Sequence, residues 1–217
     1  MRLTLPMLAW GSAAFLLARL APAAASAQTV EPGERTANDL QPPAKVMDAV
    51  GIKPGMVIGE IGAGRGRYTV FLARRVGETG KIYANDIDAT ALAYLRERCQ
   101  RDGITNVETV LGKVDDALLP KAALDMVFMV WVYHMMESPV PMLASLGPSL
   151  KPGATVVIVD PVPADVEDEF RGAPADAKFT VPTKEHVERD AALAGFELVR
   201  SMTGFLEKDN IFILRKK

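Results

Sequence analysis

The sequence predicts an α/β protein with a doubly wound (Rossmann-like), mostly parallel seven-stranded sheet and a C-terminal antiparallel β-hairpin. From residue 56 onward, short apolar segments alternate with segments of helical spacing, the pattern of a parallel sheet with crossover helices. Three glycines stand where the first apolar segment meets a helical one, in Glu60-Ile61-Gly62-Ala63-Gly64-Arg65-Gly66. The last two apolar segments are separated by too few residues for a helix, so we expect them to pair as a hairpin.

The first half of the predicted domain opens on Pro42-Pro43, because proline is tolerated in the first turn of a helix. Asp88 is placed to cap the N-terminus of a later helix. The elements expected in order are helix 44–50, strand 56–61, helix 66–76, strand 81–86 and helix 89–101.

The second half contains a nearly continuous apolar segment at residues 124–132, as expected for a strand that is buried on both faces. Thr183 is placed to cap the last helix. The elements expected in order are strands 107–111 and 124–132, helix 139–150, strand 154–159, helix 183–194, and strands 196–202 and 210–215.

The N-terminus is typical of a secretory signal. Met1-Arg2 precedes an apolar stretch, and Ala25-Ser26-Ala27 offers a small-x-small cleavage site. We therefore expect a signal peptide over residues 1–27, a linker over 28–41 and one domain over 42–217, exported to the bacterial periplasm. There are two alternatives. The N-terminal segment could stay uncleaved and anchor the chain to a membrane, or the start codon could be mis-assigned and the protein cytoplasmic.

Composition narrows the class of protein. The 217 residues carry a formal net charge of −2, and the one cluster of basic residues is Arg215-Lys216-Lys217. Nucleic-acid-binding proteins usually present a basic face, so we expect no nucleic-acid partner. A single cysteine, Cys99, excludes a disulfide within the chain and a cysteine-based metal site, and we expect no metal.

The predicted site lies at the carboxyl ends of the strands, where open α/β sheets bind ligands. The three glycines leave a bare backbone that a ligand can approach closely. Asp86 ends the second strand, 20 residues after Gly66, where a carboxylate can accept hydrogen bonds from ribose hydroxyls. Gly112-Lys113-Val114-Asp115-Asp116 follows the third strand, and Trp131-Val132-Tyr133-His134 follows the fourth.

Together these motifs resemble the class I methyltransferases that depend on S-adenosylmethionine (SAM), and are closest to uncharacterised bacterial ones. The resemblance extends from Pro42 to Arg215 and includes Leu150-Lys151-Pro152-Gly153 and Ala194-Gly195-Phe196. It implies that SAM is the cofactor. It assigns Gly62, Gly64 and Gly66 to the methionine part of SAM, Glu60 to support of this loop, Asp86 to the ribose, and Ile87, Val114 and Asp115 to the adenine. Lys113 and Val114 stand where this family often has an acidic residue.

The methyl acceptor is expected to be a small molecule that is methylated on oxygen or nitrogen. His134 and Tyr133, after the fourth strand, are the predicted catalytic residues, because histidine transfers protons near neutral pH. Methionines around that strand suit an apolar acceptor. The chain lacks the Asn/Asp-Pro-Pro-aromatic motif and the Pro-Cys nucleophile that resemblance to DNA methyltransferases would require.

Two other functions stay open at this point. A nicotinamide-dependent oxidoreductase would need Gly-x-Gly-x-x-Gly, but position 67 is arginine. An exported, non-catalytic protein that binds SAM or a nucleoside would fit the signal-like N-terminus, because SAM is made in the cytoplasm. Residues 161–182, rich in proline and acidic residues, are interpreted as an active-site lid or a surface loop.

Overall fold

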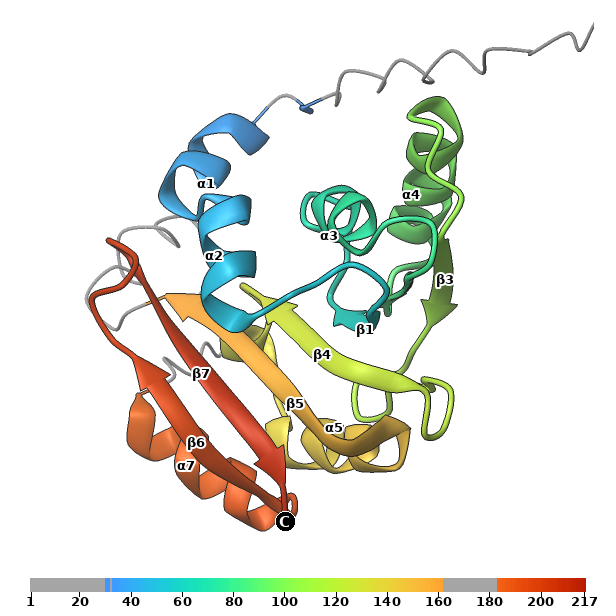
Figure 1. Cartoon of the computed structure of the whole chain (residues 1–217). Helices are drawn as coiled ribbons and strands as arrows, with labels where there is room; N and C mark the ends of the chain where they lie inside the picture. Colours follow the sequence, from blue (N-terminus) through green and yellow to red (C-terminus); the bar gives the residue numbers. More distant parts are fainter. Residues whose placement is uncertain (1–29, 32, 162–182) are drawn as a thin grey trace, which may run out of the picture.

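The computed structural model describes residues 30–31, 33–161 and 183–217. The predicted signal peptide and most of the predicted lid lie outside these residues. The described strands form one seven-stranded sheet in the order β3-β2-β1-β4-β5-β7-β6 (Figure 1). Their bounds are β1 Val57–Ile61, β2 Lys81–Asp86, β3 Val107–Leu111, β4 Leu124–Val130, β5 Leu150–Pro161, β6 Phe196–Met202 and β7 Asp209–Lys216.

The predicted fold class is confirmed. The first five strands are parallel, and β7 pairs antiparallel with both β5 and β6. The helices are α1 Glu34–Leu40, α2 Pro43–Val50, α3 Thr69–Val76, α4 Ala89–Arg101, α5 Pro139–Leu146 and α7 Lys184–Leu193, with short 3₁₀ turns η1 Tyr133–Met135 and η2 Gly147–Ser149.

Two apolar layers sandwich the sheet. On one face, α2, α3 and α4 pack through residues such as Val46, Leu72 and Leu95. On the other face, α5 and α7 pack through residues such as Leu143 and Val187. The alternation of side chains along a strand decides which layer each residue joins.

The predicted caps are observed at two helices. Asp88 accepts a hydrogen bond from the backbone N–H of Thr90 at 2.7 Å, and Thr183 accepts one from His186 at 3.3 Å. Each satisfies one of the backbone donors that a helix leaves free at its first turn.

The linker predicted for residues 28–41 is wrong over Glu34–Leu40, which forms α1. No residue of this short helix is buried, so it has no apolar stripe that a sequence pattern could reveal. An ion pair holds it to the domain instead: the Glu34 carboxylate contacts the fully buried Arg98 guanidinium of α4 at 2.6 and 2.9 Å. The folded unit therefore begins before Pro42.

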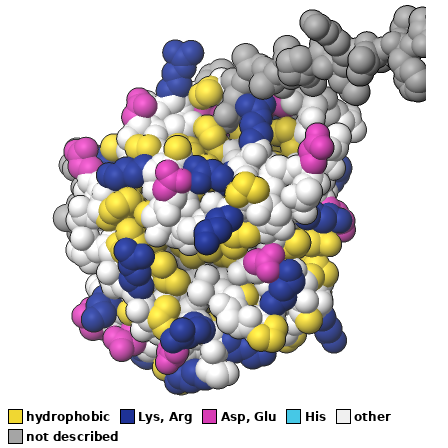
Figure 2. All heavy atoms as spheres, viewed as in Figure 1, with side chains coloured by type: hydrophobic (Ala, Val, Ile, Leu, Met, Phe, Trp, Pro, Cys, Tyr) yellow, Lys and Arg dark blue, Asp and Glu magenta, His cyan; other side chains and the backbone are white. Residues whose placement is uncertain are grey.

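The surface carries both signs of charge. Figure 2 shows Lys and Arg side chains scattered over the face seen in Figure 1, with Asp and Glu among them. The face seen in Figure 2 is therefore not uniformly basic. Among the described residues, no helix is long and apolar enough to cross a bilayer.

Candidate active site

A cavity of about 680 Å³ opens at the carboxyl ends of β1, β2, β3 and β4. The chain runs outward from β1 to β2 and β3 on one side and to β4 and β5 on the other, so the crevice lies where the strand order reverses. This is the predicted place for a ligand, and the volume suits a cofactor together with a small acceptor. Its lining residues are Ile61, Gly62, Gly64, Asn85, Asp86, Ile87, Lys113, Val114, Asp115, Trp131, Val132, Met135, Met136, Glu137, Ser138, Pro141 and Met142.

The loop after β1 forms one wall of the cavity. Gly62 has φ +69°, and a Cβ there would lie 2.2 Å from the side chain of Val132, so only glycine allows the loops after β1 and β4 to meet. Gly64 has φ +53°, and a Cβ there would meet nothing within 4 Å. It would instead project into the open cradle, which therefore fits a ligand that lies against the bare backbone.

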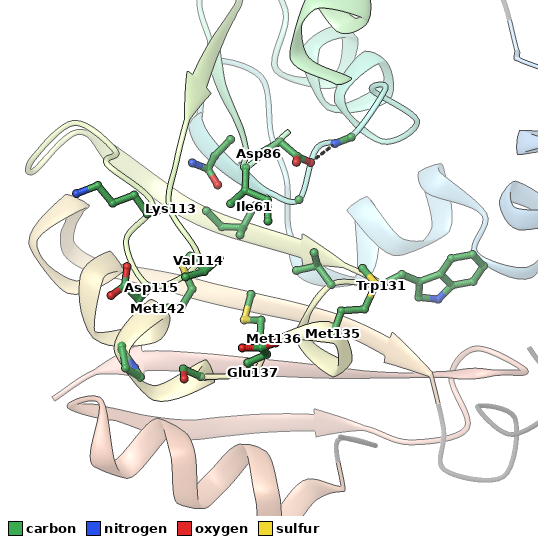
Figure 3. Close-up of a pocket in the computed structure, with 17 residues that line it drawn as sticks. Ile61, Asp86, Lys113, Val114, Asp115, Trp131, Met135, Met136, Glu137 and Met142 are labelled. Atoms are coloured by element: carbon green, nitrogen blue, oxygen red, sulfur yellow. Dashed lines mark hydrogen bonds between the residues drawn. The ribbon is translucent and has the colours of Figure 1, made fainter. Parts of the chain in front are cut away.

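Asp86 holds this loop from the end of β2 (Figure 3). One carboxylate oxygen accepts the backbone N–H of Gly64 at 2.7 Å, and the other accepts that of Asp88 at 2.9 Å. Each carboxylate oxygen has a second lone pair, so the group can also accept hydrogen bonds from a ligand. Asp86 thus has both the position and the capacity for the role that the resemblance implies.

Glu60 and Gly66 do not line the cavity. Glu60 faces α3 because side chains alternate along β1, and its carboxylate accepts the Thr69 hydroxyl hydrogen at 2.6 Å. Burial raises the pKa of Glu60 to about 8, because a charged carboxylate is poorly solvated there. At Gly66, a Cβ would lie 2.4 Å from the Leu95 side chain, so this glycine serves the packing of the loop on α4.

The remaining predicted cofactor residues reach the cavity. Ile87, Val114 and Asp115 line it together with Asp86, and the side chains of Ile87 and Val114 are exposed. A flat apolar ring such as adenine can pack against side chains of this kind. The structure therefore brings together Gly62, Gly64, Asp86, Ile87, Val114 and Asp115.

Tyr133 and His134 are buried and lie outside the cavity lining, so this geometry does not support the catalytic role predicted for them. The His134 ring contacts the buried Asp160 carboxylate at 2.5 Å, and Asp160 also accepts the backbone N–H groups of Tyr133 and His134. The Tyr133 hydroxyl donates to Asp190 at 2.8 Å, and burial together with this bond raises the pKa of Tyr133 well above its ordinary value. Both side chains stabilise the turn η1.

The reason for this placement is the backbone at Trp131. Strand β4 ends at Val130, and Trp131 adopts φ +56°, an uncommon conformation for a large side chain. The indole N–H donates to Asp209 at 2.7 Å, and the Arg67 guanidinium lies 5.0 Å from the ring centre. After this bend, Met135 and Met136 line the cavity instead of His134.

Sequence reasoning missed the charged residue that lines the far end of the cavity. Glu137 follows η1 and precedes α5, and its side chain is exposed at the rim. A carboxylate two residues before a proline-initiated helix has no pattern that distinguishes it from a surface residue. Among the described residues, no group of three or more His, Cys, Asp or Glu side chains is placed to hold a metal ion.

Comparison with known proteins finds similarity to methyltransferases. Residues 58–153 match a family described as "Methyltransferase domain". Two curated relatives are ubiquinone/menaquinone biosynthesis C-methyltransferases: that of Shewanella pealeana is 23% identical over 75% of this chain and 58% of its own length, and that of Hydrogenovibrio crunogenus is 27% identical over 51% and 44%. The chain thus spans about half the length of the curated relatives it matches.

Solved structures extend the match to nearly the whole described domain. A SAM-dependent methyltransferase from Aquifex aeolicus aligns with a TM-score of 0.72 at 27% identity, over 83% of this chain and 92% of that one. The mitomycin 7-O-methyltransferase MmcR aligns with a TM-score of 0.67 at 14% identity, over 82% of this chain and 54% of its own, a likeness of fold alone. These matches are all to methyltransferases, and the glycine cradle with Asp86 forms a site of the kind that could hold SAM.

Proposed function

We propose that this protein is a class I methyltransferase that transfers the methyl group of SAM to a small-molecule acceptor, on oxygen or nitrogen. The observation that supports the proposal is that the glycine cradle and a second, apolar end belong to the same cavity. One end carries Gly62, Gly64 and Asp86, and the other carries Met135 and Met136. A cofactor and an acceptor can therefore lie in one space with their reacting atoms adjacent, which is the main requirement of an in-line displacement.

The residues of the cradle would hold SAM, which supplies an electrophilic methyl group on a sulfonium. Asp86 would accept hydrogen bonds from the ribose while its bonds to Gly64 and Asp88 keep the loop in place. Ile87 and Val114 would cover the adenine, and Asp115 would accept from its amino group. Glu60 would support the cradle from beneath through Thr69 rather than contact the ligand.

We further propose that the mature protein works outside the cytoplasm after cleavage near Ala27. The signal-like sequence before Gln28 supports this, although SAM is made in the cytoplasm. Fractionation of cells with N-terminal sequencing of the mature protein tests it. A mature N-terminus at Met1 in the cytoplasmic fraction would refute export.

Calorimetric titration with SAM and with NAD, on wild type and Asp86→Ala, tests the cofactor roles. We expect SAM to bind wild type and to bind the variant more weakly. Tight binding of NAD without binding of SAM would contradict the proposal. Binding of SAM without transfer to any compound in a cell extract would favour the alternative, a non-catalytic SAM- or nucleoside-binding protein.

A further inference from the structure

The cavity has two chemically different ends (Figure 3). Asp86 stands at one end beside the glycine loop, and Glu137 stands at the opposite end, beyond Ile61 and the methionines. Gly62, Gly64 and Asp86, which are assigned to the methionine part and the ribose of SAM, mark the Asp86 end. The acceptor therefore has room at the Glu137 end, which is defined here by Met135, Met136, Glu137, Ser138, Pro141 and Met142.

The walls of the Glu137 end are apolar and adaptable. Three of its six side chains are thioethers, which fill irregular spaces and pack well against hydrocarbon and aromatic groups. The turn η1, which carries Met135, is held in place by the buried Asp160, whose carboxylate accepts two backbone N–H groups of η1 at 3.0 and 3.2 Å. This end suits a molecule with an apolar body.

The charges along the cavity are mostly negative. Its ionisable lining residues are Asp86, Asp115, Glu137 and Lys113, which give three negative charges against one positive, or −2. The Lys113 side chain extends away from the other labelled residues in Figure 3. SAM carries a net charge of +1, so the cavity with SAM bound remains at −1. An anionic acceptor would be repelled and a cationic one attracted.

We infer that the acceptor is an apolar amine, bound as an ammonium ion by Glu137 and methylated on nitrogen. This inference rests on the proposed function and specifies its substrate class. The apolar body packs on Met135, Met136 and Met142, and the Glu137 carboxylate directs the amino group into the cavity. Glu137 is exposed at the rim, so its carboxylate is in contact with water and can exchange protons with it.

The chemical step balances without a further reactant. The bound ammonium gives one proton to Glu137, which passes it to water at the rim. The freed nitrogen lone pair forms a bond to the methyl carbon while the carbon–sulfur bond breaks and its electron pair stays on sulfur. The products are an ammonium ion with one more methyl group, S-adenosylhomocysteine and the released proton.

Product analysis in a cell extract tests the inference. The wild-type protein is incubated with a small-molecule extract and an equal mixture of SAM and SAM with a deuterated methyl group, so that products appear as mass doublets. Fractions separated by charge at neutral pH then show the class of the product. We expect the doublets among cationic compounds, with the label on nitrogen by fragmentation.

A matched pair of variants isolates Glu137. Glu78 is also an exposed glutamate, but it lies in the turn between α3 and β2, at the amino ends of the strands and so away from the cavity. We expect Glu137→Gln to raise KM for the cationic acceptor about tenfold, the scale of a hydrogen bond to a charged group. We expect an unchanged Kd for SAM, and Glu78→Gln to match wild type in both.

Three results would overturn the inference. Doublets confined to neutral or anionic products, or label on carbon or oxygen, would each refute an amine acceptor. Wild-type kinetics in Glu137→Gln would refute the binding of the acceptor by Glu137. All three results would leave methyl transfer intact. The absence of any doublet with wild-type protein would instead refute the proposed function, and the inference with it.

Discussion

Replacing Glu60 by glutamine should change how the stability of the protein depends on pH. The Glu60 side chain is 3% exposed, and its pKa rises from 4.5 to about 8 because burial disfavours the charged form. Between these two values the folded protein holds a proton on Glu60 that the unfolded chain has released. Stability therefore falls as the pH rises from about 4.5 to about 8, and stays low above it.

The magnitude follows from the same pair of values. A pKa that moves from 4.5 to about 8 corresponds to about 5 kcal/mol, at about 1.4 kcal/mol per pH unit. Glu60→Gln keeps a hydrogen-bonding oxygen for Thr69 and has no charge to bury. The free energy of unfolding of the variant, relative to wild type, should therefore rise by a few kcal/mol between pH 5 and pH 9.

Urea denaturation of the ligand-free protein at several pH values measures this difference. The contributions of other ionisable groups are common to both proteins and largely cancel in the comparison. Parallel curves for wild type and Glu60→Gln across the range would show that Glu60 is ionised in the folded protein. The account of a neutral carboxyl group under the glycine loop would then be wrong.

Four further substitutions test other parts of the site. Asp86→Ala should weaken SAM binding by about 1–3 kcal/mol, measured by calorimetry, because polar partners lose their acceptor. Gly64→Val should abolish SAM binding while the far-ultraviolet circular dichroism stays that of wild type, since its side chain would enter the cradle. His134→Ala should lower the free energy of unfolding by about 1–3 kcal/mol, because the buried Asp160 carboxylate loses a partner. If this variant instead loses turnover at unchanged stability, His134 has a catalytic role. Glu34→Ala should destabilise the protein by about 3–5 kcal/mol in urea, because Arg98 is fully buried, whereas a loss below about 1 kcal/mol would show that α1 is only loosely attached.

The sheet could be predicted from the sequence because buried parallel strands have a distinctive pattern. Leu124–Val130 is almost wholly apolar, and turn residues separate it from its neighbours. The same periodicity locates the carboxyl ends of the strands, so Gly62, Gly64 and Asp86 could be placed at the site before any coordinates were known. These residues depend on local backbone geometry, which the sequence specifies directly.

The residues that line the Glu137 end of the cavity could not be predicted, because their placement depends on one backbone angle. If Trp131 had continued the strand, the residues after it would have followed the β4 direction toward the ligand. Its positive φ turns the chain instead, so His134 faces Asp160 and the methionines face the cavity. A tryptophan rarely adopts this conformation, and the Arg67 and Asp209 contacts that accompany it come from distant parts of the sequence.

The N-terminal helix connects these two ends of the site. Arg98, paired with Glu34 of α1, also donates to the backbone carbonyl of Arg65 in the glycine loop at 3.2 Å. On the other side, Arg67 donates to Gln41 just after α1, at 2.7 Å, and lies over the Trp131 ring. Arg67 also donates to Asn38 of α1 at 3.3 Å, so this short helix contacts two arginines, one that holds the glycine loop and one that lies over Trp131. If cleavage occurs near Ala27, the mature protein retains this helix, and the segment that was expected to be a linker is part of the folded domain.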